Sequence, residues 1–239
     1  MLYIRGFQIS LLLCSFLSLS SVQAQRALNR PGHDDMSYYF GLQVGYANMD
    51  FITNKDPKFL LDDSIYSAEP GASGGFSVGF IATKKLNTHW QARVAPQLIL
   101  GGARTFTYHL KYPNAAQSEF YTKRLTSTFL SFPLQFKFNS DRIDNFRVYM
   151  LGGLSYDVDL ASNSNLRNAE DLIKLKPSDF GVQAGVGFNF YLKFVTLSPE
   201  IKISTGLTNV HARDPYLQFS SIFDKLYSRS IMFTLNIEE

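Results

Sequence analysis

Eight charged residues of this sequence could act together, because each lies on the polar side of a run in which polar and apolar residues alternate. In HWQARVAPQL (89–98), Arg93 shares its side with two glutamines, opposite an apolar side that begins at Trp90. Successive side chains of a β-strand point to opposite faces, so the charged residues of several strands would share one interior. The set contains four basic and four acidic residues: Arg93, Lys137, Arg147, Lys202, Asp157, Asp159, Asp179 and Glu200.

The chemistry expected of this set is mutual neutralisation. A charge that is taken out of water is costly unless it is paired, and paired charges among glutamines and asparagines can form a satisfied network. We therefore expect Arg93 to meet carboxylates across the interior. The eight residues would form a lumen ionic network that plugs the structure.

Cation binding and catalysis fit these residues less well. Asp157 and Asp159 project two carboxylates to one side, but a Ca²⁺ site normally needs about six or more oxygen ligands, so pairing with lysine or arginine is favoured. The acidic stretch around Asp56, Asp62 and Asp63 is interpreted as a solvated loop. The histidines that follow the expected signal peptide are His33, His89, His109 and His211. Their spacing does not indicate a Ser-His-carboxylate group. The sequence predicts no catalytic residue, cofactor or metal site, and a protein that is not an enzyme.

The bulk composition excludes one class of partner. The chain has 239 residues and a net charge of +3, and it contains no long basic run. Nucleic-acid binding is therefore not expected. Aromatic residues are frequent, with 21 Phe and 13 Tyr.

Residues 1–24 have the features of a secretory signal peptide. Arg5 precedes an apolar core, Phe7 to Leu19, and a small-residue cleavage pattern ends at Ala24. A membrane anchor is the alternative, but the apolar core is short for a spanning helix. Cys14 is the one cysteine, so the chain from Gln25 onward would have no disulfide, reactive thiol or cysteine metal site. We expect a polar lead-in over 25–37 and one barrel domain over 38–239.

The elements that must position the charged residues are eight alternating runs. Short connections at 84–88, at 139–145 and around Lys193 alternate with long polar segments between the other runs. An even strand number, with short turns at one rim and long loops at the other, is typical of an outer-membrane barrel. The runs cover 38–48, 75–83, 89–104, 129–138, 146–160, 179–192, 196–207 and 230–237, and the long segments cover 49–74, 105–128, 161–178 and 208–229.

A soluble barrel of the lipocalin type would alternate in the same way, with its apolar side inward. The apolar side here consists of Phe, Leu, Val and Ile, which are too bulky for the interior of an eight-stranded barrel but suit contact with lipid. The fold class expected is therefore all-β: an eight-stranded antiparallel transmembrane β-barrel with a plugged polar lumen, located in the cell outer membrane and surrounded by its lipid.

Three prolines lie inside expected strands, where proline removes a hydrogen bond of the ladder. They are Pro96, Pro133 and Pro199. We expect a β-bulge at each, and a bulge would invert the assignment of inward and outward residues beyond it.

Three segments around these prolines carry a family resemblance: GFSVGFIATKKLNTHWQARVAPQL, STFLSFPLQFKFNSDRIDNFRVYMLGG and LSPEIKIS. They resemble the PorT family of outer-membrane proteins of Bacteroidetes, over nearly the whole chain from Tyr38 to Glu239. The turn Ser-x-Arg-x-x-Asn, here Ser140, Arg142 and Asn145, is similar to the family pattern. At Ser131 the family resemblance implies a carboxylate, so the lumen pairing of Lys137 or Arg147 is expected to depart from the family pattern. The sequence ends Ile237-Glu238-Glu239, without the final Phe that is common in barrels recognised by the assembly machinery.

The resemblance implies a non-enzymatic barrel required for type IX protein secretion and, in gliding species, for gliding motility. Its partners would be other type IX secretion components. Since a plugged lumen cannot conduct a protein, the role would be support, assembly or docking. Segment 105–125 keeps alternating on both sides of Pro113-Asn114, so the third and fourth strands are expected to project as a hairpin above the membrane. Two alternatives stay open: a stand-alone surface adhesin or resistance barrel of the OmpX type, acting through this hairpin, and a small pore. Segment 208–229 would either pack on the hairpin or present an apolar contact to another protein.

Overall fold

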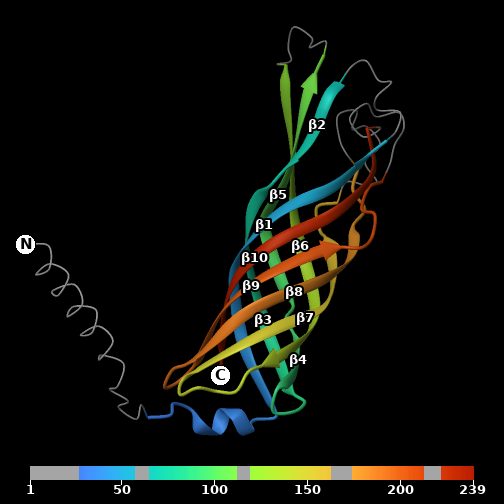
Figure 1. Ribbon diagram of the computed structural model, residues 1–239. Helices are drawn as coiled ribbons and strands as arrows, with labels where there is room; N and C mark the ends of the chain where they lie inside the picture. The colour runs from blue at the N-terminus through green and yellow to red at the C-terminus, as the bar shows by residue number, and fades with distance from the viewer. Residues whose placement is uncertain (1–26, 57–64, 112–118, 163–173, 213–221) are drawn as a thin grey trace, which may run out of the picture.

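The computed structural model describes residues 27–56, 65–111, 119–162, 174–212 and 222–239 (Figure 1). The expected signal peptide and the acidic pair Asp62-Asp63 lie outside these residues. In the described part of the chain, no helix is long and apolar enough to cross a membrane. A 3₁₀ helix, Pro31–Asp35, precedes the strands β1 Tyr38–Lys55, β2 Ile65–Gly71, β3 Ser73–Lys85, β4 Trp90–Val94, β5 Gln97–Leu110, β6 Phe120–Asn139, β7 Phe146–Asp159, β8 Ser178–Tyr191, β9 Thr196–Gly206 and β10 Phe223–Glu238.

The strands close into one antiparallel ring. β1 pairs with β10 on one side and with β3 on the other, and the order from β10 continues through β9, β8 and β7 to β6. β4 and β5 are two halves of one barrel strand between β3 and β6, while β2 continues β3 outward and pairs with β5. The ring therefore contains eight strands, which confirms the predicted barrel.

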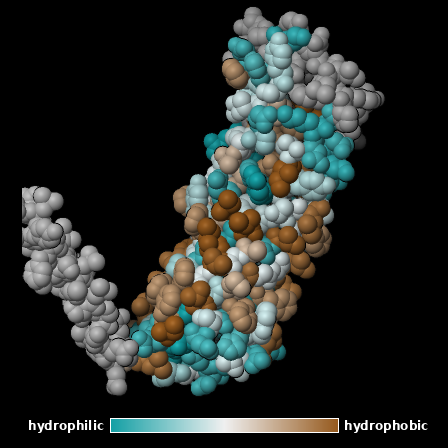
Figure 2. Space-filling model, viewed as in Figure 1, coloured by the Kyte–Doolittle hydropathy of each residue, from teal (hydrophilic) through white to brown (hydrophobic). Residues whose placement is uncertain are grey.

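The wall of the barrel turns its apolar side outward. Phe40, Phe76 and Phe80 are 66%, 73% and 69% exposed, whereas Gln135 is 0% exposed on the inward side. Figure 2 shows hydrophobic surface over the middle and lower wall, with hydrophilic surface above it and at the bottom rim. This arrangement suits contact with lipid around the wall and excludes the inward-apolar lipocalin alternative.

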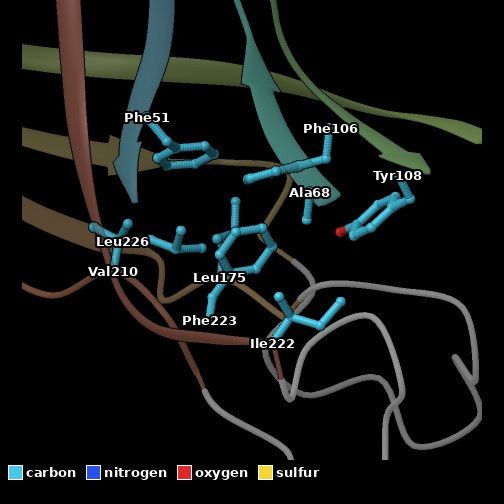
Figure 3. Packing of buried hydrophobic residues seen from close by; sticks show 9 residues of the cluster. All are labelled: Phe51, Ala68, Phe106, Tyr108, Leu175, Val210, Ile222, Phe223 and Leu226. Atoms are coloured by element: carbon cyan, nitrogen blue, oxygen red, sulfur yellow. The ribbon is translucent and has the colours of Figure 1, made fainter. Parts of the chain in front are cut away.

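The long-loop end is more ordered than the sequence predicted. β1 and β10 extend beyond the predicted runs into segments expected to be loops. β5 and β6 extend as the hairpin expected over 105–125, and β2 joins them in a three-stranded ribbon that projects from the rim (Figure 1). An apolar cluster lies at the base of this ribbon. Figure 3 shows its side chains pointing toward one another from strands and loops, and its members are Phe51, Ala68, Phe106, Tyr108, Leu175, Val210, Ile222, Phe223 and Leu226.

The prolines interrupt the ladder without shifting it, so the predicted bulges at these positions are wrong. Val94 pairs with Leu134 and Gln97 pairs with Ser131, so the register of the pairing is the same on both sides of Ala95-Pro96. Ala95 N donates to Pro133 O at 3.3 Å, and Pro133 has no N–H with which to return the bond. Pro199 likewise lies where the β8–β9 pairing lapses between Gly187–Glu200 and Phe190–Leu197 without a change of register.

The bulge that does invert the facing lies later in the same barrel strand. The β5–β6 register shifts between Ile99 and Gly102, and Gly101 has φ of +74°, a conformation that favours glycine. Before the shift the odd-numbered residues face inward, and after it Gly102, Arg104 and Phe106 are buried. The bulge therefore turns Arg104 into the interior, although uninterrupted alternation would place it on the lipid side.

A glycine next to Tyr149 gives a test of how tightly the lumen is filled. A Cβ at Gly187 would overlap the Tyr149 ring and hydroxyl, and Tyr149 is 1% exposed. We expect Gly187→Ala to lower the free energy of unfolding by about 1–3 kcal/mol, the usual cost of overpacking, measured as a lower urea midpoint in lipid vesicles. Gly152→Ala is the matched control, because its Cβ would have 3.9 Å of clearance. Equal midpoints for the two variants would contradict this packing.

Candidate functional site: the sealed lumen

Arg93 lies at the centre of the lumen between two carboxylates. Its Nη1 donates to Glu200 Oε2 at 2.8 Å and its Nη2 to Glu238 Oε1 at 2.9 Å. The three side chains, from β4, β9 and β10, are at most 1% exposed. A guanidinium can serve two carboxylates at once because its donors form a planar fork, so Arg93 links opposite walls of the barrel.

Glu200 collects further donors. Tyr149 Oη donates to Glu200 Oε2 at 2.7 Å, and Lys202 Nζ lies 3.0 Å from Glu200 Oε1 as an ion pair. Lys137 is bound differently: its Nζ lies 3.8 Å from the centre of the Tyr149 ring and donates to Asn189 Oδ1 at 3.2 Å. The inner half of the lumen thus has more basic than acidic side chains.

The outer half of the lumen is acidic, and its carboxylates do not pair with lumen cations as predicted. Asp179 accepts hydrogen bonds from the hydroxyls of Thr208 and Ser228. Ser155 Oγ donates to Asp157 Oδ2 at 3.2 Å, and Ala161 N donates to Asp159 Oδ1 at 2.9 Å. Within the residues that the structure describes, none of the three carboxylates forms an ion pair, because hydroxyl and amide donors from nearby loops and strands hold them.

Arg104 enters this outer half from the bulged strand and was not predicted. Its guanidinium lies between two rings, 4.3 Å from the centre of Phe51 and 4.5 Å from that of Phe129, and its Nε has no hydrogen-bond partner. Aromatic faces attract a guanidinium through the ring quadrupole. A glycine inside an apolar run was the sequence signal for this bulge.

The eight predicted residues therefore do not form one network. The structure brings together Arg93, Glu200 and Lys202, with Lys137 adjacent, and holds Asp157, Asp159 and Asp179 apart from them. Glu238 was missed, although it continues the polar side of β10 by two residues beyond Asn236. Arg147 pairs with a residue outside the strands: its Nη1 lies 3.0 Å from Asp34 Oδ1.

The segment that contains Asp34 closes the short-turn rim, and we call residues 27–36 the N-terminal cap. It runs across the bottom of the barrel (Figure 1). Arg142 Nη1 donates to Asp34 Oδ2 at 3.1 Å and its guanidinium lies 3.7 Å from the Tyr191 ring centre. Asn145 Oδ1 accepts from Asn29 N at 2.7 Å. Two of the three residues of the Ser-x-Arg-x-x-Asn turn thus hold the cap.

His33 is the buried centre of the cap and gives it a pH dependence. Burial and the charge of Arg30 lower the pKa of His33 from 6.5 to about 4, against smaller opposing effects of Glu238 and Asp34. The other groups that face it are Tyr39, Tyr191, Lys137, Arg147 and Lys85. Between pH 6.5 and 4 a released cap binds a proton that the docked cap does not, so docking weakens as the pH falls and strengthens as it rises.

We therefore expect a spin label at Leu28→Cys to become more mobile between pH 6.5 and 4.5. The same label in His33→Gln should show a much smaller change over that interval, because glutamine does not titrate. Equal pH responses of the two proteins would exclude His33 as the cause.

The remaining histidines offer no active site in the described residues. His89 Nδ1 contacts Asn139 O at 3.1 Å at the short-turn rim, and His109 Nε2 contacts Glu119 Oε1 at 2.9 Å on the ribbon. His211 is buried and forms an isolated antiparallel bridge with Leu175. In the described residues, no group of three or more His, Cys, Asp or Glu residues could hold a metal ion.

Described side chains thus fill the lumen along its length. Among the cavities that described residues line, one of about 30 Å³ lies beside Arg104 and one of about 40 Å³ lies beneath the cap. Each has room for a few water molecules. The apolar cluster lies at the outer end and the cap lies at the inner end, so this geometry defines a membrane barrel with a filled lumen.

The sequence comparisons agree with this class. Residues 23–212 match the model of a family described as outer membrane protein beta-barrel domain. The chain belongs to this family, and it is an outer-membrane β-barrel protein. A comparison with curated proteins found no match.

Similar solved structures are small outer-membrane proteins. OprG from Pseudomonas aeruginosa is 12% identical, with a TM-score of 0.49, over 84% of this chain and 95% of that one. Neisserial surface protein A is 13% identical, with a TM-score of 0.42, over 83% and 96%. Ail of Yersinia pestis, solved with the heparin analogue sucrose octasulfate, is 11% identical, with a TM-score of 0.39, over 85% and 100%.

Proposed function

We propose that this barrel is a non-enzymatic component of type IX protein secretion in the outer membrane, acting in support, assembly or docking. The proposal rests on the PorT-like segments of the sequence. The Ser-x-Arg-x-x-Asn turn adds support, because Arg142 and Asn145 have a defined structural task in holding the cap. In a gliding species the same role would extend to motility.

The observation that carries the choice of role is the closed lumen. Arg93 and Lys137 are 0% exposed at its centre, and a passing polypeptide would have to displace buried ion pairs together with both end closures. Removing one partner of a buried ion pair costs about 3–5 kcal/mol. A barrel of this kind serves secretion through its rims or its lipid-facing wall, where other type IX components would bind.

Gene deletion tests the proposal. Cells without the protein should lose export of type IX cargo, and a plasmid copy should restore it. Export at the wild-type level in the deleted strain would contradict the proposed role. Cross-linking in intact cells would then identify which secretion components lie against the barrel.

A second candidate, a stand-alone adhesin or resistance barrel of the OmpX type, is favoured by the projecting ribbon. β2, β5 and β6 carry hydrogen-bonded pairs out to Ile65–Leu110 and His109–Phe120, and residues at loop tips are common sites of partner contact. Purification from solubilised membranes separates the candidates: co-purified secretion components favour the first, and a lone monomer favours the second.

Ion conductance tests the third candidate, a small pore. We expect purified protein in planar lipid bilayers to give no regular conductance steps at neutral pH, because the lumen cavities beside Arg104 and beneath the cap measure only about 30 and 40 Å³. A porin incorporated in parallel is the positive control. Uniform single-channel steps that disappear with boiled protein would contradict the sealed lumen.

A further inference from the structure

The N-terminal cap contacts the inner rim through its backbone as well as through its side chains. Asn145 Nδ2 donates to Ala27 O at 3.1 Å, and Arg142 donates to the carbonyls of Asn29 and Arg30. Lys85 Nζ donates to the carbonyl of Asp34. Because these bonds address main-chain atoms, part of the recognition of a peptide segment at this rim does not depend on its side chains.

A single carboxylate supplies the charge recognition. Asp34 lies between Arg142, at 3.1 Å, and Arg147, at 3.0 Å, and no other acidic side chain of the described residues pairs with either arginine. If the cap leaves, Arg142, Arg147 and Lys85 lose the anionic or carbonyl oxygens that they bind. The exposed rim would then be a basic surface with the Tyr191 ring beside it.

The cap contains one residue in an unfavourable backbone conformation. Arg30 has φ of +50°, in the left-handed region that costs a non-glycine residue roughly 1 kcal/mol or more. The side chain of Arg30 compensates through Thr196 Oγ1 at 3.1 Å and Glu238 O at 3.0 Å. Residues 27–36 form no backbone–backbone hydrogen bond with the described residues of the barrel, and the first such bond, Lys85 N to Ser37 O, comes directly after the cap.

We propose that the inner rim is a docking site for an extended, carboxylate-bearing peptide segment, which the cap occupies within the same chain and which a periplasmic partner can take over. The partner segment binds Arg142 and Arg147 through an Asp or Glu, and Asn145 through its main chain. This inference rests on the proposed docking role and gives it a surface. Because the rim faces the periplasm with the short turns, the partner reaches it from that side.

The test follows the position of the cap in the full mature chain. Leu28 is half exposed, so Leu28→Cys accepts a fluorophore at the single cysteine expected after signal cleavage, and Trp90, the one tryptophan, serves as donor at the same rim. Energy transfer from Trp90 to the label is high when the cap is docked. The probe is a synthetic peptide of residues 27–36, added to purified protein in detergent or vesicles.

We expect the peptide to lower the energy transfer in a saturable way, and Arg142→Gln to weaken peptide binding at least tenfold. In the labelled chain, Asp34→Asn should reduce transfer without added peptide, whereas Asp35→Asn, an exposed neighbour, should not. A peptide that carries the Asp34→Asn change should compete at least tenfold less well. Lys193→Gln, at the exposed tip of another short turn, is the control for Arg142→Gln.

Two results would overturn the docking site. One is energy transfer from Trp90 that stays unchanged both with saturating peptide and in the Asp34→Asn chain. This result would show that the cap is a fixed part of the barrel. The other is equal competition by the wild-type peptide and the Asp34→Asn peptide, which would remove the carboxylate from recognition. Both measurements use purified protein, so they are independent of the export assay: normal export in a deleted strain would reject the secretion role alone.

Discussion

Replacing Arg93 with methionine is expected to lower the free energy of unfolding by about 3–5 kcal/mol, because the change leaves Glu200 and Glu238 buried without the cation that they share. Both carboxylates lie within 2.9 Å of the guanidinium, and Glu238 has no other ion pair among the described residues. The measurement is urea-induced unfolding in lipid vesicles, followed by the fluorescence of Trp90.

Two variants show whether the loss comes from the uncompensated charge. Adding Glu238→Gln to Arg93→Met should recover a substantial part of the stability, because Glu200 keeps Lys202 and Tyr149 as partners. Arg229→Gln is the control: Arg229 pairs with Asp50 at an exposed position, where an ion pair contributes about 1 kcal/mol or less. Unfolding of Arg93→Met at the wild-type urea concentration would show that the central ion pairs are not structural.

The second large effect is expected at the outer apolar cluster. Phe223 is 0% exposed and its ring centre lies 5.1 Å from that of Phe106. Phe223→Ala should cost about 3–5 kcal/mol through lost burial and the cavity that it leaves. Since the cluster joins β1, β5, β10 and two loops outside the membrane band, we expect local opening at the ribbon before the barrel unfolds.

Limited proteolysis of intact cells or vesicles measures this opening. Phe223→Ala should be cleaved in the outer segments several times faster than wild type, while the membrane-embedded strands remain protected. Tyr66→Ala, which removes a ring that is 59% exposed on the ribbon, should leave the cleavage rate close to wild type. Equal rates for Phe223→Ala and wild type would show that the cluster does not hold the ribbon.

Alternation predicted most of the fold because two different solvents act on the two sides of the wall. Lipid outside and a crowded polar lumen inside require strict period-2 alternation, so the positions of β7, β8 and β9 agree with the predicted runs within one or two residues. The outer extensions of β1 and β10 were harder to predict, since above the membrane both faces of a strand can be wet and alternation weakens.

The lumen partners were predictable only where regular alternation continued. Arg93 and Glu200 belong to uninterrupted stretches, whereas Arg104 lies beyond the shift at Gly101, which moves it from the outer to the inner face. Asp34 lies in a segment in which polar and apolar residues do not alternate regularly. The hydroxyls of Thr208 and Ser228 reach Asp179 from distant parts of the chain, a proximity that the pairing of β8, β9 and β10 creates.

The interruptions at proline have a mechanical consequence. At Ala95-Pro96 the pairing lapses toward β3 on one side and toward β6, at Pro133, on the other, and at Pro199 it lapses between β8 and β9. The ladder between β6 and β7 has no such gap. Fewer hydrogen bonds cross the wall at the interrupted seams, so we expect the strands to shear past one another more easily there than along β6 and β7.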